Sequence, residues 1–282
     1  MAACVFPVSP IGVSACVPCY NQRSTVAQAV RSVRDQTLPI GEVFVIDDGS
    51  TDGLPESVEG VPVIRLGTNR GRGAARARAM EEARHDLVLC CDATNALAPD
   101  FAAKARPWFD DPEVAGVFGV IRPGPHRTLP ARWRARHLFK AGSQSSVRRQ
   151  ALLATWGCLL RRSAVLAVGN FDPALRHSED ADLGRRLLAA GYDVVADPAL
   201  WVESIADNTV GEVLERYWRW NAGVGEQVSW RGYARMVSYS VRVMVREDLR
   251  AGDVPAAAVS LLCPHYQVWR SWGRRTAGFS QR

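Results

Sequence analysis

Long apolar runs and lysine are what this 282-residue sequence has least of. A membrane-spanning helix needs about 18 consecutive apolar residues, and no stretch of the chain approaches that length. The mildly apolar N-terminus lacks a basic region and runs into a strand-like segment, so no signal peptide is expected. Apolar residues at 47% and charged residues at 23% exclude a largely disordered chain. We therefore predict a folded, cytoplasmic protein.

Lysine contributes only Lys104 and Lys140 to the 35 basic residues, and the net charge is +6. The other basic residues are arginine, whose planar guanidinium suits phosphate and carboxylate partners. A coding bias toward arginine is the simpler explanation of this excess. The alternatives that stay open are an anionic ligand, a nucleic acid and an acidic membrane surface.

The seven cysteines are an odd number and are scattered among apolar neighbours, which is typical of reduced, buried thiols in a cytosolic protein. Cys16 and Cys19 form one Cys-x-x-Cys motif. No second such motif follows, and Cys16 lies inside an apolar run, so neither a zinc site nor a redox site is expected.

Strand-like and helix-like segments alternate through the first 120 or so residues. Short apolar runs typical of strands lie at 13–17, 43–46, 61–66, 87–91 and 114–121. Helix-like stretches lie at 25–35, with Ser24 as the candidate N-cap, and at 73–84. This alternation predicts an α/β fold with a mostly parallel, Rossmann-like sheet flanked by helices. Ligands of such sheets bind at the carboxyl ends of the strands.

The remaining chain divides into three parts. Residues 122–149 are rich in proline, glycine and arginine and predict an irregular basic insertion. Regular structure returns at 151–160, and a helix is expected from about Asp180 to Ala190. From Gly211 the chain is helical and rich in tryptophan. We expect a domain over 1–210, with a nucleotide-binding half at 11–121 and an acceptor-side half at 151–210, and a helical extension over 211–282.

Polar groups follow several of the expected strands. Asp47 and Asp48 come directly after one of them, where two adjacent carboxylates repel each other unless something uses them. A tight turn is the simpler interpretation, but a carboxylate can also accept hydrogen bonds from a nucleobase or a ribose. Asp92 ends another strand and is a candidate ligand for Mg²⁺ or Mn²⁺, with a simple turn as the alternative.

Two further groups carry charge on expected helices. Glu179 and Asp180, preceded by His177, begin a helix, where acids are favoured by the helix dipole as well as by any catalytic use. Arg216 and Arg219 share a helix face beside Trp220, an arrangement that suits a diphosphate and a stacked ring. A solvated arginine face with tryptophans packed inward is the equally weighted alternative.

The order of these motifs resembles the family 2 glycosyltransferases, which have the GT-A nucleotide-sugar fold. The segments that carry the resemblance are CVPCYNQRSTVAQAVRSVRDQT, EVFVIDDGSTDG, NRGRGAARARAMEEARHDLVLCCDATNALAPDF and WGCLLRRSAVLAVGNFDPALRHSEDADLGRRLLAAGYDV. The resemblance covers residues 11–225. The resemblance implies sugar transfer from a nucleoside diphosphate donor, with inversion at the anomeric carbon.

The resemblance also implies roles for individual residues. The nucleotide-binding set is Pro18, Cys19, Tyr20, Asn21, Asp47, Asp48, Arg76 and Asp92. Trp156 and Gly157 line the sugar pocket, to which we add His177, Arg216, Arg219 and Trp220. Glu179 and Asp180 are the catalytic pair, with Asp180 as general base and Glu179 orienting the acceptor or capping the helix. RYWRW is similar to a signature of processive synthases.

Two departures from the family pattern concern the metal. Thr94 and Asn95 follow Asp92 where further acids are usual, and Glu203 stands about where the family often has a histidine ligand. Three interpretations stay open: a divalent Mn²⁺ or Mg²⁺ ion bound by Asp92 and Glu203, metal-independent transfer with arginines neutralising the diphosphate, and a nucleotide-binding protein that has lost catalysis.

We therefore predict an inverting glycosyltransferase with an unidentified acceptor. A transferase acting on DNA or another anionic polymer is a further alternative, although nucleic acid is the less favoured partner. Peripheral contact with the inner face of a membrane, and oligomer formation, stay open.

Overall fold

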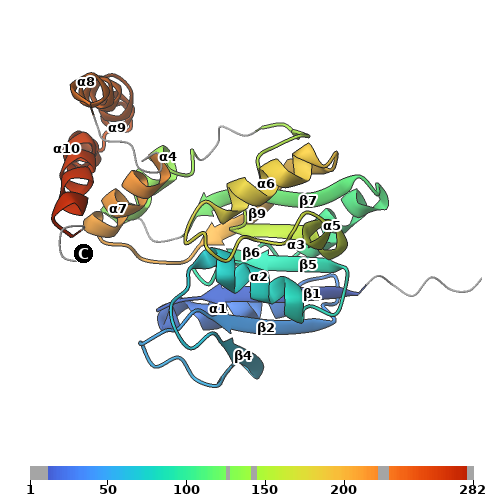
Figure 1. Cartoon of the computed structure of the whole chain (residues 1–282). Coiled ribbons are helices and arrows are strands. Elements are labelled where there is room, and N and C mark those ends of the chain that lie inside the picture. The colour runs from blue at the N-terminus through green and yellow to red at the C-terminus, as the bar shows by residue number, and fades with distance from the viewer. Residues whose placement is uncertain (1–11, 125–127, 141–144, 222–228, 278–282) are drawn as a thin grey trace, which may run out of the picture. The chain divides into compact units, whose positions relative to one another are not determined.

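The computed structural model of the chain describes residues 12–124, 128–140, 145–221 and 229–277. The ends of the range that carries the family resemblance, Ile11 and 222–225, lie outside the described residues. The chain forms two compact units, drawn in Figure 1. The first unit joins Met1–Arg122 to Gly142–Ala206, and the second joins Pro123–Ala141 to Asp207–Arg282.

A sheet of nine strands, counted in the described residues, forms the centre of the first unit, in the order β3-β4-β2-β1-β5-β8-β7-β9-β6. Its strands are β1 (Val13–Cys19), β2 (Glu42–Asp47), β3 (Ser57–Val58), β4 (Val61–Arg65), β5 (Leu87–Cys91), β6 (Asn95–Leu97), β7 (Val114–Pro123), β8 (Gly157–Arg161) and β9 (Asp193–Ser204). β1 pairs in parallel with β2 and β5, and β2 with β4, whereas β8 runs antiparallel to β5 and β7. The carboxyl ends of the parallel strands therefore share one edge.

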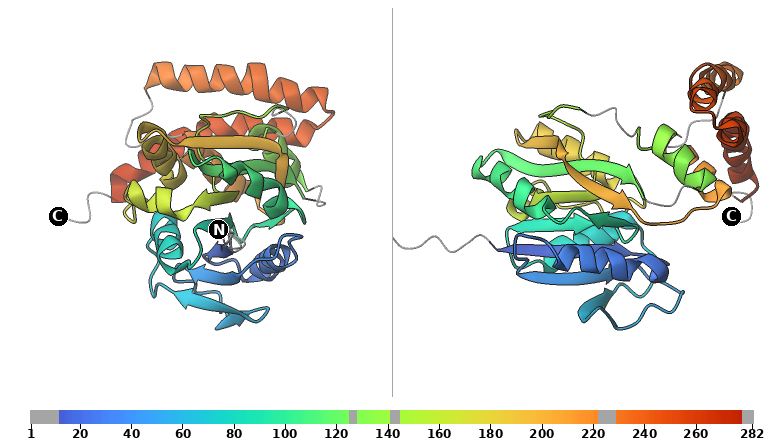
Figure 2. Two further views of the ribbon diagram at one scale, coloured as in Figure 1. Left: turned by 90° about the vertical axis from the view of Figure 1, so that its right-hand side faces the viewer. Right: turned by 180° about the vertical axis from the view of Figure 1, so that it is seen from behind.

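Helices cover both faces of this sheet, which confirms the expected α/β class. They are α1 (Arg23–Arg34), α2 (Arg72–Glu82), α3 (Phe101–Ala105), the 3₁₀ helix η1 (Arg106–Asp110), α5 (Arg162–Ala167) and α6 (Glu179–Ala189). Figure 2 shows α1 and α2 on opposite faces. The expected cap at Ser24 is wrong, because α1 already begins at Arg23, whose N–H donates to Asp52 at 2.8 Å.

The α2 face of the sheet is sealed by buried apolar side chains of α2, α5, α6 and the central strands. Cys16, Cys90 and Cys158 stand in register on three neighbouring strands within this core. The Cys16 and Cys90 sulfurs are 3.3 Å apart. The six cysteines in the described part of the chain are all buried and free, so packing rather than a disulfide holds these strands.

The second unit is helical in its described residues. It contains α4 (Leu129–His137), α7 (Val210–Asn221), α8 (Trp230–Tyr239), the π-helical η2 (Ser240–Val245), α9 (Arg246–Arg250) and α10 (Val254–Ala277). The irregular structure expected throughout residues 122–149 is wrong at α4. Thr128 accepts a hydrogen bond from the Ala131 N–H at its N-terminus, and Trp133 is buried against Tyr217 and Val259.

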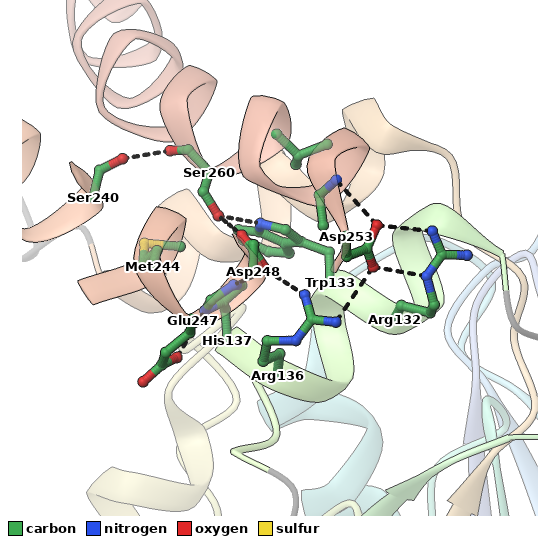
Figure 3. Close-up of polar contacts among 12 residues, drawn as sticks. Arg132, Trp133, Arg136, His137, Ser240, Met244, Glu247, Asp248, Asp253 and Ser260 are labelled. Carbon is green, nitrogen blue, oxygen red and sulfur yellow. Dashed lines mark hydrogen bonds and ion pairs between the residues drawn. The ribbon is translucent and has the colours of Figure 1, made fainter. Parts of the chain in front are cut away.

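A network of buried charges joins α4 to α9 and α10, as Figure 3 shows. Asp248 is fully buried and accepts hydrogen bonds from Arg136, from His137 Nε2 at 2.8 Å and from Ser260 Oγ at 2.5 Å. Ser260 Oγ in turn accepts from Trp133 Nε1 at 2.8 Å. These contacts make Asp248 the carboxylate on which the packing of α4 depends.

Asp253 holds the neighbouring end of the same network. It accepts from Arg132 Nε at 2.8 Å and from Arg136 Nη2 at 3.3 Å. The hydrogen bond from Arg132 is the largest of the influences that lower the pKa of Asp253 to about 2. The carboxylate therefore stays charged, and stabilises the folded unit, until the pH falls toward that value.

Replacing Asp248 with Asn should destabilise the second unit by about 3–5 kcal/mol, because Arg136 loses one of its two counter-ions and the buried hydrogen bonds from His137 and Ser260 lose a charged acceptor. The measurement is the free energy of unfolding, with hydrogen exchange in α4 and α10 as the local readout. Glu247→Gln is the matched control, since Glu247 is 47% exposed and should change the free energy by under about 1 kcal/mol. Equal effects of the two substitutions would contradict the network.

Candidate functional site

The loops that follow β1 and β2 are joined to each other through Asn21. Its Oδ1 accepts from the Thr51 N–H at 2.8 Å, and its own N–H donates to Ser50 Oγ at 2.9 Å. Asn21 has a φ of 51°, in the left-handed region that asparagine tolerates. Tyr20 beside it is exposed. The two loops therefore form one wall at the carboxyl edge of the sheet.

Backbone groups of β1 fix the next strand ends to this wall. The Pro18 carbonyl accepts from the Ala93 N–H at 3.4 Å, and the Cys19 carbonyl accepts from the Asp48 N–H at 2.9 Å. Cys19 is buried, so its side chain is part of the core. Of the four residues expected to bind the nucleotide in this loop, Tyr20 and Asn21 are the ones whose side chains are exposed.

Asp47 and Asp48 are both buried and already bonded within the chain. Asp47 accepts from the Ser50 N–H at 2.9 Å and from Arg65 at 2.7 Å. Asp48 accepts from the backbone N–H groups of Arg70 at 2.7 Å and Gly71 at 2.8 Å. Burial raises the pKa of Asp48, and these N–H groups oppose the rise. Both acids thus shape the loops of this edge, and a contact with a nucleotide stays a prediction.

Two glycines let the start of α2 approach the loop before α6. The Gly73 N–H donates to the Leu175 carbonyl at 3.0 Å, and a Cβ on Gly73 would lie 2.1 Å from the Asp172 carbonyl oxygen. Gly71 has a φ of 100°, and a Cβ there would lie 2.6 Å from Arg176 Cα. No larger residue fits either position without moving the backbone, so these glycines bring α2 and α6 together.

Arg76, one turn further along α2, occupies the centre of the site. Its side chain is 1% exposed and bridges two carboxylates. Nη2 donates to Asp92, at the end of β5, at 2.5 Å, and Nη1 donates to Glu179, the first residue of α6. Three segments that are far apart in the sequence meet at this guanidinium.

The charges at this centre depend on one another. Burial opposes the charge on Arg76, but Asp92, Glu179 and Asp180 outweigh that effect and raise the pKa of Arg76. Burial raises the pKa of Glu179, and Arg76 and Arg72 counteract the rise. Glu179 Oε2 is buried without a hydrogen-bond partner among the described residues. The site therefore contains a permanent cation surrounded by acids.

Asp180 follows Glu179 on α6 but is only half-buried. Its Oδ1 accepts from the Ala181 N–H at 2.8 Å, which anchors the carboxylate to the helix N-terminus. Ser178, the residue before the helix, has a φ of 64° and turns the chain sharply into it. Glu179 thereby points inward to Arg76 while Asp180 keeps contact with solvent.

Trp156 and Gly157 lie beside Asp92. The Asp92 N–H donates to the Trp156 carbonyl at 3.4 Å, and the indole Nε1 of Trp156 donates to the Gly119 carbonyl at 2.8 Å. A Cβ on Gly157 would lie 2.2 Å from a methyl group of Val202 on β9. The half-buried indole is thus fixed to the Gly119 carbonyl while the Trp156 backbone contacts Asp92, and the place of both residues in a sugar pocket stays a prediction.

The roles expected of the remaining site residues stay predictions. His177 is exposed in the loop before α6, and Glu203 lies on β9 opposite Ala96 of β6. Arg216, Arg219 and Trp220 lie on α7 in the second unit, so their place in the sugar pocket stays a prediction.

Sequence reasoning did not identify Arg65 or Arg72 as parts of the site. Arg65 stands in register with Asp47 on the neighbouring parallel strand. Asp47 ends β2 and Arg65 ends β4, and these strands are neighbours in the sheet. The pair could have been predicted from the sequence only if the strand order had been known.

Comparison with known proteins decides the family. The model of "Glycosyl transferase family 2" matches residues 14–169. The chain belongs to glycosyl transferase family 2. The matched residues include the β1 and β2 edge, Arg76, Asp92 and Trp156, and end before α6.

Curated proteins similar to this chain include poly-beta-1,6-N-acetyl-D-glucosamine synthases. Those of Staphylococcus aureus (strain COL) and Staphylococcus epidermidis (strain ATCC 35984) are each 24% identical to this chain, over 79% of it and 56% of the relative. The chain thus spans about half the length of the curated relatives it matches.

Solved structures confirm the GT-A fold. Staphylococcus aureus TarS 1-349 has a TM-score of 0.55 at 17% identity, covering 93% of this chain and 92% of TarS, and it has also been solved with UDP-GlcNAc. The mannosyltransferase PcManGT from Pyrobaculum calidifontis, in complex with GDP-Man and Mn²⁺, has a TM-score of 0.53 at 18% identity. That match covers 96% of this chain and 75% of the mannosyltransferase.

The donor set at Asp92 fits a metal ion that arrives with its ligand rather than a resident one. Among the described residues, no group of three or more His, Cys, Asp or Glu side chains is arranged to hold an ion. One oxygen of Asp92 is taken by Arg76, and its side chain is 20% exposed. Mg²⁺ and Mn²⁺ can bind through one or two carboxylates when substrate phosphates supply further ligands.

Replacing Arg76 with Met should lower the free energy of unfolding by about 3–5 kcal/mol near neutral pH, because buried Glu179 and half-buried Asp92 lose their counter-ion. Without the cation, the pKa of Glu179 in the folded state rises further above its unfolded value. Stability is then lost as the pH rises, so the deficit should be larger at about pH 8 than at about pH 5.

Denaturant unfolding at the two pH values measures this difference. Arg78→Met on the same helix is the control, because Arg78 is exposed and its ion pairs with Glu81 and Glu82 lie at the surface. A pH-independent deficit for Arg76→Met would show that the carboxylates do not depend on this guanidinium.

Proposed function

We propose that this chain is an inverting glycosyltransferase, which transfers a sugar from a nucleoside diphosphate donor to an acceptor nucleophile. The observation that carries the proposal is the junction at Arg76, where Asp92 at the end of β5 and the Glu179–Asp180 pair at the start of α6 meet. Membership of the family supports sugar transfer, and the carboxyl edge of the sheet is where this fold binds ligands.

The nucleoside is proposed to bind at the wall formed by the loops after β1 and β2. Exposed Tyr20 offers a ring for stacking, and Asp47 and Asp48 hold the surrounding backbone N–H groups in place. UDP is the favoured nucleotide because TarS binds UDP-GlcNAc, and the synthases are named for N-acetylglucosamine. The GDP-Man complex of the mannosyltransferase makes GDP the main competitor.

Asp180 is proposed as the general base. It is held at the helix N-terminus by its bond to the Ala181 N–H, yet stays half-exposed where an acceptor hydroxyl could reach it. It removes the proton of that hydroxyl as the oxygen attacks the anomeric carbon, and the diphosphate leaves from the opposite face. A single displacement of this kind inverts the anomeric configuration.

Glu179 is proposed as a positioning residue rather than a second base. It is buried against Arg76, and its negative charge compensates the guanidinium. Arg76 in turn fixes Asp92 beside Trp156. The pocket is thereby preorganised for the developing charge of the leaving diphosphate.

A divalent ion, if used, is proposed to be held by Asp92 together with the donor phosphates, with Glu203 as a second carboxylate. Such an ion would neutralise the leaving diphosphate. The Mn²⁺ in the mannosyltransferase complex supports this use in the fold. Arginine neutralisation is the competing proposal, supported by Arg72, whose charge acts on Glu179.

Replacing Asp180 with Asn should lower the rate of nucleoside diphosphate release from the donor by about 10²–10⁴-fold, because the amide cannot accept the proton. Donor binding should be nearly unchanged. Asp182→Asn, on the same helix and paired with Arg186, is the control and should keep its activity. Near-normal turnover of Asp180→Asn in a chemically limited step would move the base elsewhere, and His177 would be the next candidate.

Thermal shifts with a panel of nucleoside diphosphates should show stabilisation by UDP above the other bases. Binding to the folded state raises stability by mass action, about 2.7 kcal/mol at a hundredfold excess over the Kd. Asp48→Ala should weaken that binding by about 1–3 kcal/mol.

The same measurement with Mn²⁺ tests the metal. If the stabilisation by UDP grows when Mn²⁺ is added, and this increase is lost in Glu203→Gln, the result supports an ion held by both Asp92 and Glu203. If Mn²⁺ does not change the stabilisation by UDP, the result supports neutralisation of the diphosphate by arginines. If the chain binds UDP but does not turn over the donor, the result supports a nucleotide-binding protein that has lost catalysis.

A further inference from the structure

The second unit carries most of the large apolar side chains that the described part of the chain exposes. Eight of the twelve lie between Trp230 and Trp269. Trp230 is 80% exposed and Trp269 is 63% exposed. An exposed tryptophan does not gain the hydrophobic free energy that burial provides. A concentration of such residues in one unit therefore indicates a surface that binds a partner.

These side chains lie on two helical segments that pack against each other. α8, η2 and α9 continue one another as the long orange rod of Figure 2, and α10 runs beside it. Tyr233 of α8 bonds to His265 Nδ1 of α10 at 2.9 Å, and its ring meets that of Trp230 edge-on. α8 buries no residue fully, although it has apolar side chains along its length.

α10 adds an aliphatic stripe to the same region. Val254, Leu261, Leu262 and Trp269 are all exposed, and their spacings of about seven and eight residues place them on one helix face. The opposite face of α10 packs Ala256, Val259 and Cys263 into the core of the unit. α10 thus has apolar side chains both on its core face and on its exposed face.

The charge on the rod is almost entirely of one sign. Its arginines are Arg231, Arg235, Arg242, Arg246 and Arg250, all exposed and none in an ion pair with another described residue. Arg231 and Arg235 are four residues apart, and so are successive members of the set Arg242, Arg246 and Arg250. The guanidinium groups of each set therefore line up along the helix. Of the two acids, Asp248 is buried in its network, which leaves Glu247 as the exposed one.

We propose that the exposed surface of α8, η2, α9 and α10, called here the α8–α10 surface, binds an anionic lipid bilayer and lies in its interface. Tryptophan and leucine side chains insert among the acyl chains, and the arginines meet the phosphates of acidic lipids. In the described residues, no helix has the length and apolar character needed to cross a bilayer, so these helices lie along the membrane.

Other occupants of the surface fit the same side chains less well. A second copy docked symmetrically would bring two rows of arginine together, and like charges repel across an interface. A nucleic acid would satisfy the arginines and stack on the tryptophans, but it offers nothing to Val254, Leu261 and Leu262. A bilayer offers anionic phosphates and apolar chains within a few ångströms of each other.

Vesicle co-sedimentation of the 282-residue chain tests the proposal. Binding to phosphatidylcholine vesicles that contain phosphatidylglycerol should exceed binding to pure phosphatidylcholine by at least about tenfold, and salt should weaken it. Trp230→Ser combined with Trp269→Ser should lower the partition coefficient at least about tenfold, since both side chains lose their apolar insertion. Arg231→Gln combined with Arg235→Gln should abolish much of the preference for the anionic lipid.

Matched controls separate this surface from the rest of the chain. Leu152→Ser removes an apolar side chain that is 53% exposed from the first unit, and Arg78→Gln with Arg84→Gln removes the same charge there. Both should bind vesicles as the parent does. Lipids brominated in their acyl chains should quench the fluorescence of the parent, and the double tryptophan variant should lose that quenching.

Four results would overturn the proposal: no vesicle binding, equal binding to neutral and anionic vesicles, equal loss in the controls, or binding without quenching by brominated chains. A self-association abolished by the tryptophan pair would assign the surface to a second copy. Tighter binding to single-stranded DNA than to anionic vesicles would assign it to nucleic acid. These readouts are independent of turnover, so they stand whether or not the proposed transfer reaction is found.

Discussion

The buried guanidinium of Arg76 is the constraint around which the first unit is arranged. A charge removed from water costs several kcal/mol unless opposite charges replace the lost solvent, and here Asp92 and Glu179 replace it. These carboxylates come from the end of β5 and the start of α6. The sheet and α6 therefore keep a fixed relation at the point where the candidate chemistry takes place. The close approach of α2 to the loop before α6, through Gly71 and Gly73, is the steric condition for this arrangement.

The same guanidinium sets the electrostatics that a bound donor would meet. Since the pKa of Arg76 is raised, its charge does not vary over any ordinary pH range. Asp92 enters the site with one oxygen already neutralised, so it attracts a divalent ion less strongly than an isolated carboxylate would. Two observations agree here. The sequence lacks further acids directly after Asp92, and the described residues contain no cluster of three acidic, histidine or cysteine ligands. In both, Asp92 has few acidic neighbours and is paired with a cation of the chain itself.

The sequence was sufficient for five of the nine strands, the α/β class and the family, because each depends on local pattern; β3, β6, β8 and β9 were not predicted as strands. The apolar run at 87–91 coincides with β5, and the acids after β2 stand at the expected edge. Contacts between distant segments were not predictable in the same way. Nothing near Asp47 indicates that its partner is Arg65, because that pairing depends on strand order. α4 was missed because its apolar spacing is weak, and its burial depends on Asp248 and Asp253, more than a hundred residues further along.

The long-range ion pairs of this structure use arginine in a way that lysine could not reproduce. Arg76 uses its two terminal nitrogens for two different carboxylates, and Arg136 does the same with Asp248 and Asp253. Arg132 grips Asp253 through Nε and Nη2, and Arg270 grips Glu215 through the same two atoms. A lysine ammonium is a point charge and cannot hold two partners in a fixed plane. Coding bias can account for the number of arginines but not for these forked contacts, each of which joins segments that the backbone alone would leave apart.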